Sequence, residues 1–134
     1  MTEPVYVPVD AARHLVDFYE TALADRWPTL TCGLALEGDW SPAAGAPFLV
    51  VFDEGGGLTP PIITSPTLRV TVWHRDRDVA RAVAARALGL ALCRRIPGIA
   101  KVLPGTSLIV DRDNRNGARI ASFTVRTRAR MLAD

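Results

Sequence analysis

Few side chains in this sequence are of the types that carry out catalysis, and their spacing assembles no catalytic site. The chain holds two histidines, His14 and His74, and two cysteines, Cys32 and Cys93. Neither histidine is accompanied by a nucleophile with a positioned base, which covalent catalysis requires, so we expect both to be structural. The cysteines fit no metal-ligand spacing, and their apolar surroundings predict reduced core thiols. The sequence therefore predicts no enzyme activity, no cofactor and no metal site.

Two segments have the composition of ligand-binding loops, but neither has the required pattern. Residues 111–117 read DRDNRNG, as in a calcium loop. The glycine comes one place late, Arg115 stands at a ligand position, and Ser122 takes the place of the closing glutamate. The glycines at 55–57 are followed by neither phosphate-binding pattern nor a helix start. We exclude both ligands and interpret Asn116-Gly117 as a hairpin turn.

The chain is organised around residues 67–96, which predict a strand followed directly by a helix. From Leu68 to Trp73 apolar and polar residues alternate, with Leu68, Val70 and Val72 on one face. This period is typical of a strand with one buried face. A helix should then begin at Asp76 or Asp78, since either carboxylate can accept from free first-turn amides. Pro97-Gly98 should end it.

Periodicity predicts one further helix and several further strands. A helix should run from Asp10 to about Arg26. Strands are predicted at 30–37, 48–52, 107–111 and 119–131, and residues 99–103 are predicted to be extended. With 134 residues, these elements predict a single small α+β domain over residues 1–134. The strand order stays open, and the 76–96 helix could be a right-handed crossover between parallel strands or a cover joining antiparallel ones.

The stretch 53–66, DEGGGLTPPIITSP, is predicted to be the least regular part of the chain. Three consecutive glycines and three prolines should exclude a long regular element. Loops of this length in compact domains are often functional or disordered. Within it, Ile62 and Ile63 could dock on a neighbouring molecule or form a short edge strand. The interface candidates here are Gly55, Gly56, Gly57, Ile62 and Ile63.

Charge is distributed unevenly along the chain. Residues 1–66 hold two basic and nine acidic residues, whereas residues 67–134 hold fourteen basic and five acidic ones. The charges of the two halves could interleave in the fold. Alternatively, an acidic face and a basic face coexist, and such a surface is self-complementary head to tail, as a ring or filament needs.

The last predicted strand, from Arg119 to about Met131, carries a row of three arginines. Arg126, Arg128 and Arg130 share its solvent side at a spacing of two. One interpretation is an edge strand whose charges prevent aggregation. The others are an interface with an acidic protein partner, including the next copy of the same chain, and a contact with a phosphate backbone.

No segment predicts a membrane or export signal. The N-terminus lacks a basic region followed by an apolar core. The longest unbroken apolar run, Ala87 to Cys93 with Gly89 included, is far too short to span a bilayer. We therefore expect no membrane association and folding in a reducing cytoplasm.

Two long segments carry a resemblance to a known family. They are RVTVWHRDRDVARAVAARALGLAL, from Arg69 to Leu92, and PGIAKVLPGTSLIVDRDNRNGARIASFTVRTRARM, from Pro97 to Met131. The chain resembles the tail terminator proteins of long-tailed (siphovirus-type) bacteriophages. The N-terminal half, with a helix, two strands and a long loop, fits the same layout. The resemblance implies a small subunit in which two helices pack on a mainly antiparallel β-sheet.

The resemblance also implies a structural function. Tail terminators form a six-fold ring on the last ring of the tail tube, end tube polymerisation and provide the joint to the head-neck complex. The implied partners are other copies of the chain, the tail tube protein and head-neck connector proteins, and the implied location is the head-proximal end of the virion tail after assembly in the host cytoplasm. Genomic DNA would pass through the lumen without specific binding, so we assign Arg126, Arg128 and Arg130 to a subunit or tube interface.

Three other functions remain open from the sequence. A head-tail connector or neck subunit would share most of these features. A nucleic-acid-binding module would use the basic C-terminal half, although the chain has no helix-turn-helix signature, zinc site or stacking surface of aromatic and basic residues. A small-ligand-binding or enzymatic α+β domain would need a pocket with convergent polar groups, for which the sequence offers no residues.

Overall fold

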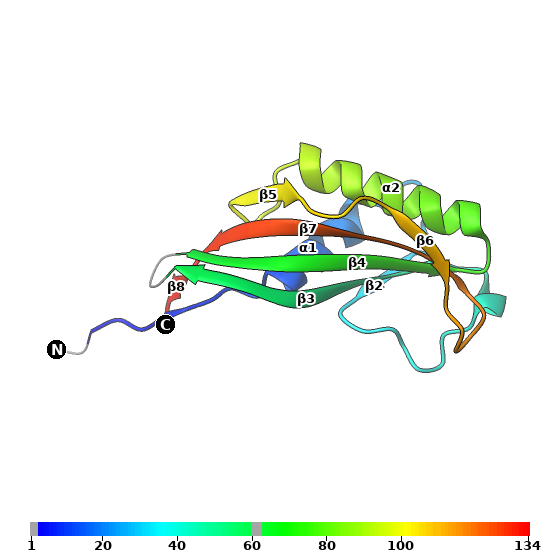
Figure 1. Ribbon diagram of the computed structural model, residues 1–134, viewed down its shortest axis with the longest axis horizontal. Coiled ribbons are helices and arrows are strands. Elements are labelled where there is room, and N and C mark those ends of the chain that lie inside the picture. The colour runs from blue at the N-terminus through cyan, green and yellow to red at the C-terminus, as the bar shows by residue number, and fades with distance from the viewer. Residues whose placement is uncertain (1–2, 60–62) are drawn as a thin grey trace.

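Alternating apolar residues place most of this chain in one sheet, and two amphipathic helices cover it. The computed structural model describes residues 3–59 and 63–134 (Figure 1). The elements are β1 (Tyr6–Val7), α1 (Ala11–Ala22), β2 (Thr31–Gly33), a 3-10 turn η1 (Pro42–Ala44), β3 (Phe48–Thr59), β4 (Ile63–His74), α2 (Arg77–Cys93), β5 (Lys101–Pro104), β6 (Ile109–Arg112), β7 (Arg119–Arg130) and β8 (Leu132–Ala133).

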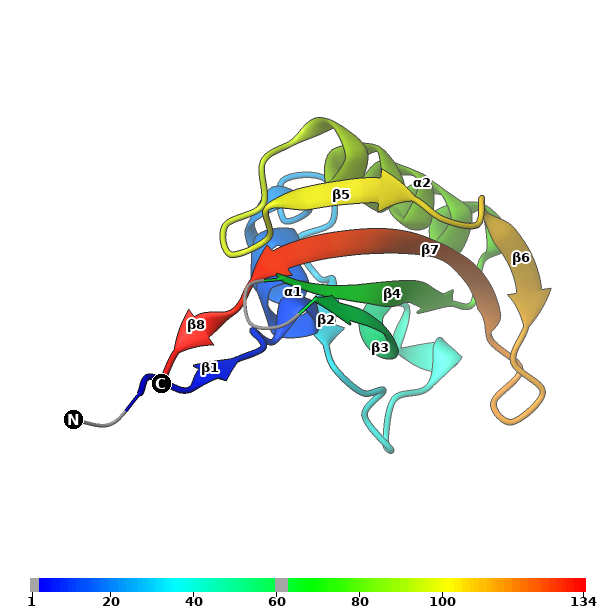
Figure 2. The ribbon, with the colours of Figure 1, turned by 60° about the vertical axis from the view of Figure 1, so that its left-hand side comes forward.

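The main sheet has the strand order β2-β3-β4-β7-β5. β5 and β6 pair with the same edge of β7, β6 with its first half and β5 with its second half. Every neighbouring pair is antiparallel except β2 and β3, which are parallel. The predicted α+β class, with two helices on a mainly antiparallel sheet, is therefore confirmed. Figure 2 shows β5, β7, β4 and β3 side by side, with both helices behind them.

Both helices pack on the same face of the sheet. Each begins after an aspartate whose carboxylate accepts from a first-turn amide, at 3.1 Å for Asp10 and Arg13 and 2.9 Å for Asp76 and Asp78. The apolar stripes of the helices meet the inward face of β3, β4 and β7. The largest fully buried side chains include Tyr19, Phe123, Leu15, Leu23, Leu49 and Leu68.

The structure settles the connection that α2 makes. β4 and β5 both pair antiparallel with β7, so they run parallel to each other with β7 between them. α2 is therefore a crossover between parallel strands, one of the two arrangements that the sequence left open. Within the described residues, neither α1 nor α2 is long and apolar enough to cross a membrane.

The prediction of an irregular loop over residues 53–66 was wrong. β3 continues to Thr59 and β4 begins at Ile63, so the two strands form a long hairpin. The ladder shifts register between Asp53 and Gly56, where Gly55 adopts a positive φ of 76°. The Asp53 carboxylate accepts from the Gly55 amide at 2.8 Å and holds this β-bulge. The glycines therefore permit a strand with a bulge instead of preventing one.

Gly56 and Gly57 should respond oppositely to the same substitution. A Cβ at Gly56 would collide with the backbone carbonyl of Ser65, whereas a Cβ at Gly57 would meet no atom within 4 Å. We expect Gly56→Ala to lower the free energy of unfolding by about 1–3 kcal/mol. Gly57→Ala should change it by less than about 0.5 kcal/mol. Urea titration of both variants tests this, and equal losses would show that the bulge geometry is wrong.

β7 is not an edge strand, so that interpretation of its arginines was wrong. Its one side pairs with β4 along almost its whole length, and its other side pairs with β5 and β6. The arginines project from the face of the sheet, not from an edge. The predicted alternation is confirmed, because Phe123 and Val125 are buried while Arg126, Arg128 and Arg130 are exposed.

Other predicted boundaries were too long. The first helix ends at Ala22, not near Arg26, and the strand predicted at 30–37 is limited to β2. Beyond Gly33 the chain leaves the sheet, and Leu34 and Leu36 pack on opposite sides of it. At the far end of the molecule β1 and β8 form a separate two-stranded ribbon that projects from the sheet (Figure 2).

Candidate interaction face of the sheet

The face of the sheet opposite the helices is the candidate functional surface, which we call the open face. Successive strand residues point to opposite faces. Phe52 of β3, Arg69 of β4 and Thr124 of β7 lie in one register row across the sheet. Arg69 is exposed, whereas its neighbours Leu68 and Val70 are buried beneath the helices. No α-helix of the described chain covers the open face.

One end of the open face is strongly basic. It carries Arg126, Arg128 and Arg130, and each of these arginines lies about 7 Å along the strand from the next. Lys101 of β5 lies directly opposite Arg128 in the ladder. We call these four residues the basic end. Arg126 also donates from Nε to the carbonyl oxygen of Pro104 at 3.3 Å, which holds its stem against β5.

The charges of the basic end have no ion-pair partner among residues 3–59 and 63–134. In the part of the chain that the structure describes, the ion pairs involve Arg69, Arg77 and Arg115 and none of the four basic-end residues. Like charges directly opposite each other across a ladder are destabilising, as Lys101 and Arg128 are. The isolated subunit therefore carries a repulsion that an anionic partner would relieve.

The structure brings the two interface regions predicted from the sequence to the same end of the sheet. Ile63 at the start of β4 pairs with Arg130, and Gly57 pairs with Ser65 next to it on the hairpin. Gly55 lies in the bulge of the same strand, and Gly56 resumes the ladder directly after it by pairing with Pro66. Ile62 lies outside the described residues. The hairpin and the arginine row thus belong to one surface.

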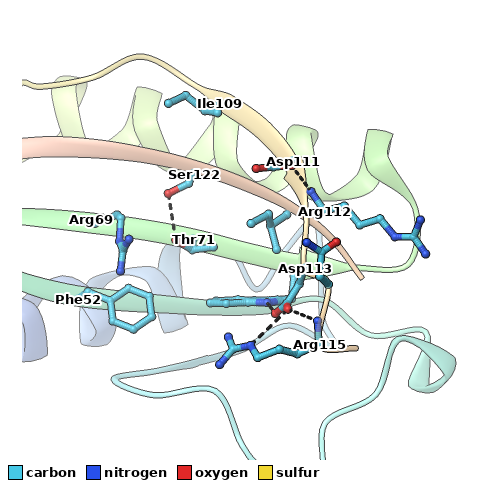
Figure 3. Close-up of a pocket in the computed structure, with 12 residues that line it drawn as sticks. Phe52, Arg69, Thr71, Ile109, Asp111, Arg112, Asp113, Arg115 and Ser122 are labelled. Carbon is cyan, nitrogen blue, oxygen red and sulfur yellow. Dashed lines mark hydrogen bonds and ion pairs between the residues drawn. The ribbon is translucent and has the colours of Figure 1, made fainter. Parts of the chain in front are cut away.

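The other end of the open face is a shallow groove of about 680 Å³ (Figure 3). Its apolar lining residues are Phe52, Trp73, Ile109 and Ile120, and polar or charged side chains form the rest of the lining. The Arg69 guanidinium lies 4.6 Å from the centre of the Phe52 ring and forms a cation–π contact. Across β4 and β7, the hydroxyls of Thr71 and Ser122 hydrogen-bond at 3.0 Å.

A buried carboxylate anchors the β6–β7 hairpin beside this groove. Trp73 donates from its indole nitrogen to Asp113 Oδ2 at 2.9 Å, and the Arg115 amide donates to Oδ1 at 2.9 Å. The Trp73 N–H holds the pKa of the Asp113 carboxyl below its ordinary value, the Arg115 amide adds to this, and burial opposes both. Gly117 closes the turn with a φ of 75°, as the Asn116-Gly117 signal predicted.

Asp113→Ala should destabilise the fold, because it leaves the buried Trp73 N–H without a partner. We expect the free energy of unfolding at pH 7 to fall by about 1–3 kcal/mol. Since folding lowers the pKa of Asp113, its contribution is complete above the ordinary value of about 4 and is lost as the pH falls through the folded-state value.

The difference between Asp113→Ala and the wild type should therefore shrink below about pH 4. The exposed neighbour Asp111 is the matched control, and Asp111→Ala should cost less than about 0.5 kcal/mol. Denaturant titrations at pH 7 and pH 3 measure both variants. An Asp113→Ala loss that is the same at both pH values would contradict this role of the carboxylate.

Trp73 and Asp113 were missed by the sequence analysis. The alternation of residues predicted that Trp73 lies on the solvent-exposed face of its strand, but only 5% of Trp73 is exposed. A second small core covers it, in which Trp73 packs with Phe48, Val50 and Ala118. The available signal was a tryptophan on an otherwise polar strand face, together with an aspartate in a turn.

His74 and Cys32 have structural environments. His74 is buried, accepts at Nδ1 from the Asp76 amide at 2.9 Å, and contacts the Gly45 carbonyl through Nε2 at 3.0 Å. Burial, with a smaller contribution from nearby Glu20, raises the pKa of the Cys32 thiol to about 12, which leaves little reactive thiolate. Cys93 is exposed, so the prediction that both thiols lie in the core was wrong for this one.

The two halves of the chain form opposite sides of the domain. α1 contacts mainly β3 and β2, with a smaller contact to β4, whereas α2 contacts β7, β4 and β5. The side with α1 and β3 displays the exposed acidic residues Asp17, Glu20, Asp53 and Glu54. The side with α2, β5 and β7 displays Arg81, Arg86, Arg94, Lys101, Arg126 and Arg128. Each side also carries some opposite charge, with Arg13 on α1 and Asp76 and Asp78 at the start of α2. The halves therefore differ by an excess of one sign on each side of the domain.

Only one ion pair of the described residues joins the two halves, between Arg69 and Glu54 at 3.0 Å. Both side chains are largely exposed, so this pair contributes little to stability. Within the same residues, no cluster of three or more His, Cys, Asp or Glu side chains is arranged to hold a metal ion. A search of protein-family models found no match for this chain, and a search of curated proteins found none either.

Proposed function

We propose that this chain is a structural subunit of a ring that caps the tail tube of a long-tailed bacteriophage, ends tube polymerisation and joins the tail to the head-neck complex. The observation that supports the proposal is the excess of acidic residues on the α1–β3 side of the domain and of basic residues on the α2–β5–β7 side. A heterologous contact repeats when each subunit presents both complementary surfaces, and it closes into a ring if the rotation allows. The sequence resemblance to tail terminators supplies the identity of the ring.

The basic end fits a protein interface better than a DNA-lining surface. A lumen through which DNA slides should not hold phosphates tightly, and four unneutralised cations within one flat area would do so. An acidic neighbouring surface would relieve the repulsion between Lys101 and Arg128. In this account the subunit acts through its surfaces and performs no catalysis.

Tube assembly tests this function. Tail tube protein polymerised in the presence of the chain should form tubes that stop growing and carry a ring at one end, as seen by negative-stain electron microscopy. Without the chain the tubes should continue to lengthen. Tubes that grow equally long and uncapped in both conditions would contradict the proposal. A ring that binds connector proteins but not tubes would instead favour the neck subunit.

A nucleic-acid-binding module is the second candidate, favoured by the four exposed cations of the basic end. Such a module would bind DNA or RNA with a steep salt dependence, in which the logarithm of affinity falls with a slope of about −0.9 per neutralised phosphate. Filter binding across a salt series distinguishes the two candidates. The ring subunit should bind weakly at physiological salt, whereas a tight complex with a steep slope would favour the module.

A further inference from the structure

Two strand edges at the basic end of the sheet have no partner in the described chain. β2 pairs with Phe48–Val50 only, so the outer side of β3 is free beyond Val50. On the opposite side of the sheet, β5 pairs with β7 and with no other strand. Unpaired edges expose rows of amide and carbonyl groups that can pair with another chain. Both free edges lie at the end of the sheet that carries the arginine row.

The directions of the strands determine how two copies could meet. At this end the sheet consists of β3, β4, β7 and β5, each antiparallel to the next. Because the number of strands is even, the two outer strands run in opposite directions. When copies repeat in the same orientation, β5 of one copy therefore lies beside β3 of the next copy and runs antiparallel to it. Two strands in this orientation can form an antiparallel ladder of hydrogen bonds.

We propose that β5 of one subunit pairs with residues 56–59 of β3 in the next subunit, so that the antiparallel sheet continues across the subunit boundary. This inference rests on the self-assembly proposed above and specifies its contact. Each segment has four residues, and the register that overlaps them fully places Leu58 opposite Val102 and Gly57 opposite Leu103.

The side chains of both segments suit this register. Leu58 is 52% exposed in the subunit and faces the helix side of the sheet, as Val102 does. Pairing would bring these two apolar side chains together. Gly57 and Leu103 belong to the open face, where a Cβ at Gly57 meets no atom within 4 Å. The glycine therefore leaves space for the Leu103 side chain of the neighbouring copy.

Charge favours pairing of unlike edges. Two β3 edges brought together would place two acidic edges side by side, each with Asp53 and Glu54, and two β5 edges would place two basic edges side by side, each with Lys101. The β5 edge instead belongs to the basic side of the domain and the β3 edge to the acidic side, so that association of unlike edges is attractive. The occupant of each free edge is therefore a second copy of this chain in head-to-tail contact.

Disulfide trapping tests the pairing. In a Cys93→Ser background, which removes the exposed native thiol, Leu58→Cys and Val102→Cys are combined in one chain and oxidised mildly. Directly opposite positions in a ladder have the spacing that a disulfide requires. We expect a ladder of covalent multimers on non-reducing gels. Leu58→Cys combined with Ile109→Cys, on β6 at the other end of the sheet, is the matched control and should give no ladder.

The mass of the particles, measured on the same samples, separates the possible outcomes. Multimers that form without the Leu58–Val102 cross-link would overturn the sheet continuation and leave the ring proposal standing. A monomer under all conditions, including with tail tubes, would overturn both. As a second readout, Gly57→Phe should weaken assembly at least tenfold while the unfolding midpoint of the monomer stays unchanged, and unchanged assembly would contradict the pairing.

Discussion

The double variant Arg126→Glu/Arg128→Glu should abolish ring assembly and leave a folded monomer. Both side chains are exposed on the open face, so their replacement removes no core contact. The one hydrogen bond lost is that from Arg126 Nε to the Pro104 carbonyl, at 3.3 Å on the surface. If the basic end meets an acidic neighbour, the reversal replaces two attractions with two repulsions. We expect the association constant to fall at least a hundredfold, or about 2.7 kcal/mol.

The control for this variant carries the same change in charge at the other end of the sheet. Arg75 and Arg77 follow the end of β4 where His74 pairs with Arg119, away from the basic end. Arg75→Glu/Arg77→Glu should therefore assemble nearly as the wild type does. Light scattering after size exclusion measures the mass, and circular dichroism measures folding. Equal loss of assembly in both variants would mean that net charge, not the arginine row, controls association.

The largest effect on stability is expected from Tyr19→Ala. Tyr19 is completely buried between the helices, and its hydroxyl donates to the Ala87 carbonyl oxygen at 2.8 Å. This bond joins α1 to α2 across the core, and burial raises the pKa of the phenol above its ordinary value. Removing the ring should lower the free energy of unfolding by about 3–5 kcal/mol, because a large cavity remains.

Two further variants complete the comparison, one that separates the contribution of the ring from that of the hydroxyl and one that serves as a control. Tyr19→Phe keeps the packing and loses the hydrogen bond, so we expect a cost of about 1 kcal/mol. Tyr6→Ala, at a half-exposed tyrosine of the β1–β8 ribbon, should cost less than about 0.5 kcal/mol. Chemical denaturation of all three provides the comparison. A Tyr19→Ala loss near that of Tyr6→Ala would mean that α1 is not packed as described.

The elements that the sequence predicted well are those with a long uninterrupted period. The alternation from Leu68 to Val72 and from Arg119 to Arg130 belongs to strands that bury one face against helices. The two aspartate caps were recognisable because each precedes an amphipathic stripe. In these cases the local pattern and the tertiary environment agree, so the pattern alone is sufficient to predict the secondary structure.

The features that were missed depend on partners far away in the sequence. The glycines at 55–57 were read as a loop, because composition does not show that β4 supplies a ladder partner for a bulged strand. Trp73 was predicted to be exposed to solvent. It is buried because Phe48 and Ala118, which are distant in the sequence, pack against it. The sheet order, which places Lys101 beside Arg128, also has no local signal. Of the candidate surface, the arginine row was therefore predicted, but the groove and Asp113 were not.

The mass of the particles that the wild-type chain forms, free in solution and after release from tail tubes, tests the central claim most directly. The monomer has a mass of 14.5 kDa. The account predicts a closed ring, which for the implied six-fold symmetry has six times this mass, and which dissociates into monomers when Arg126 and Arg128 are reversed to glutamate. A particle of 14.5 kDa at every concentration, both alone and on tail tubes, would contradict the account.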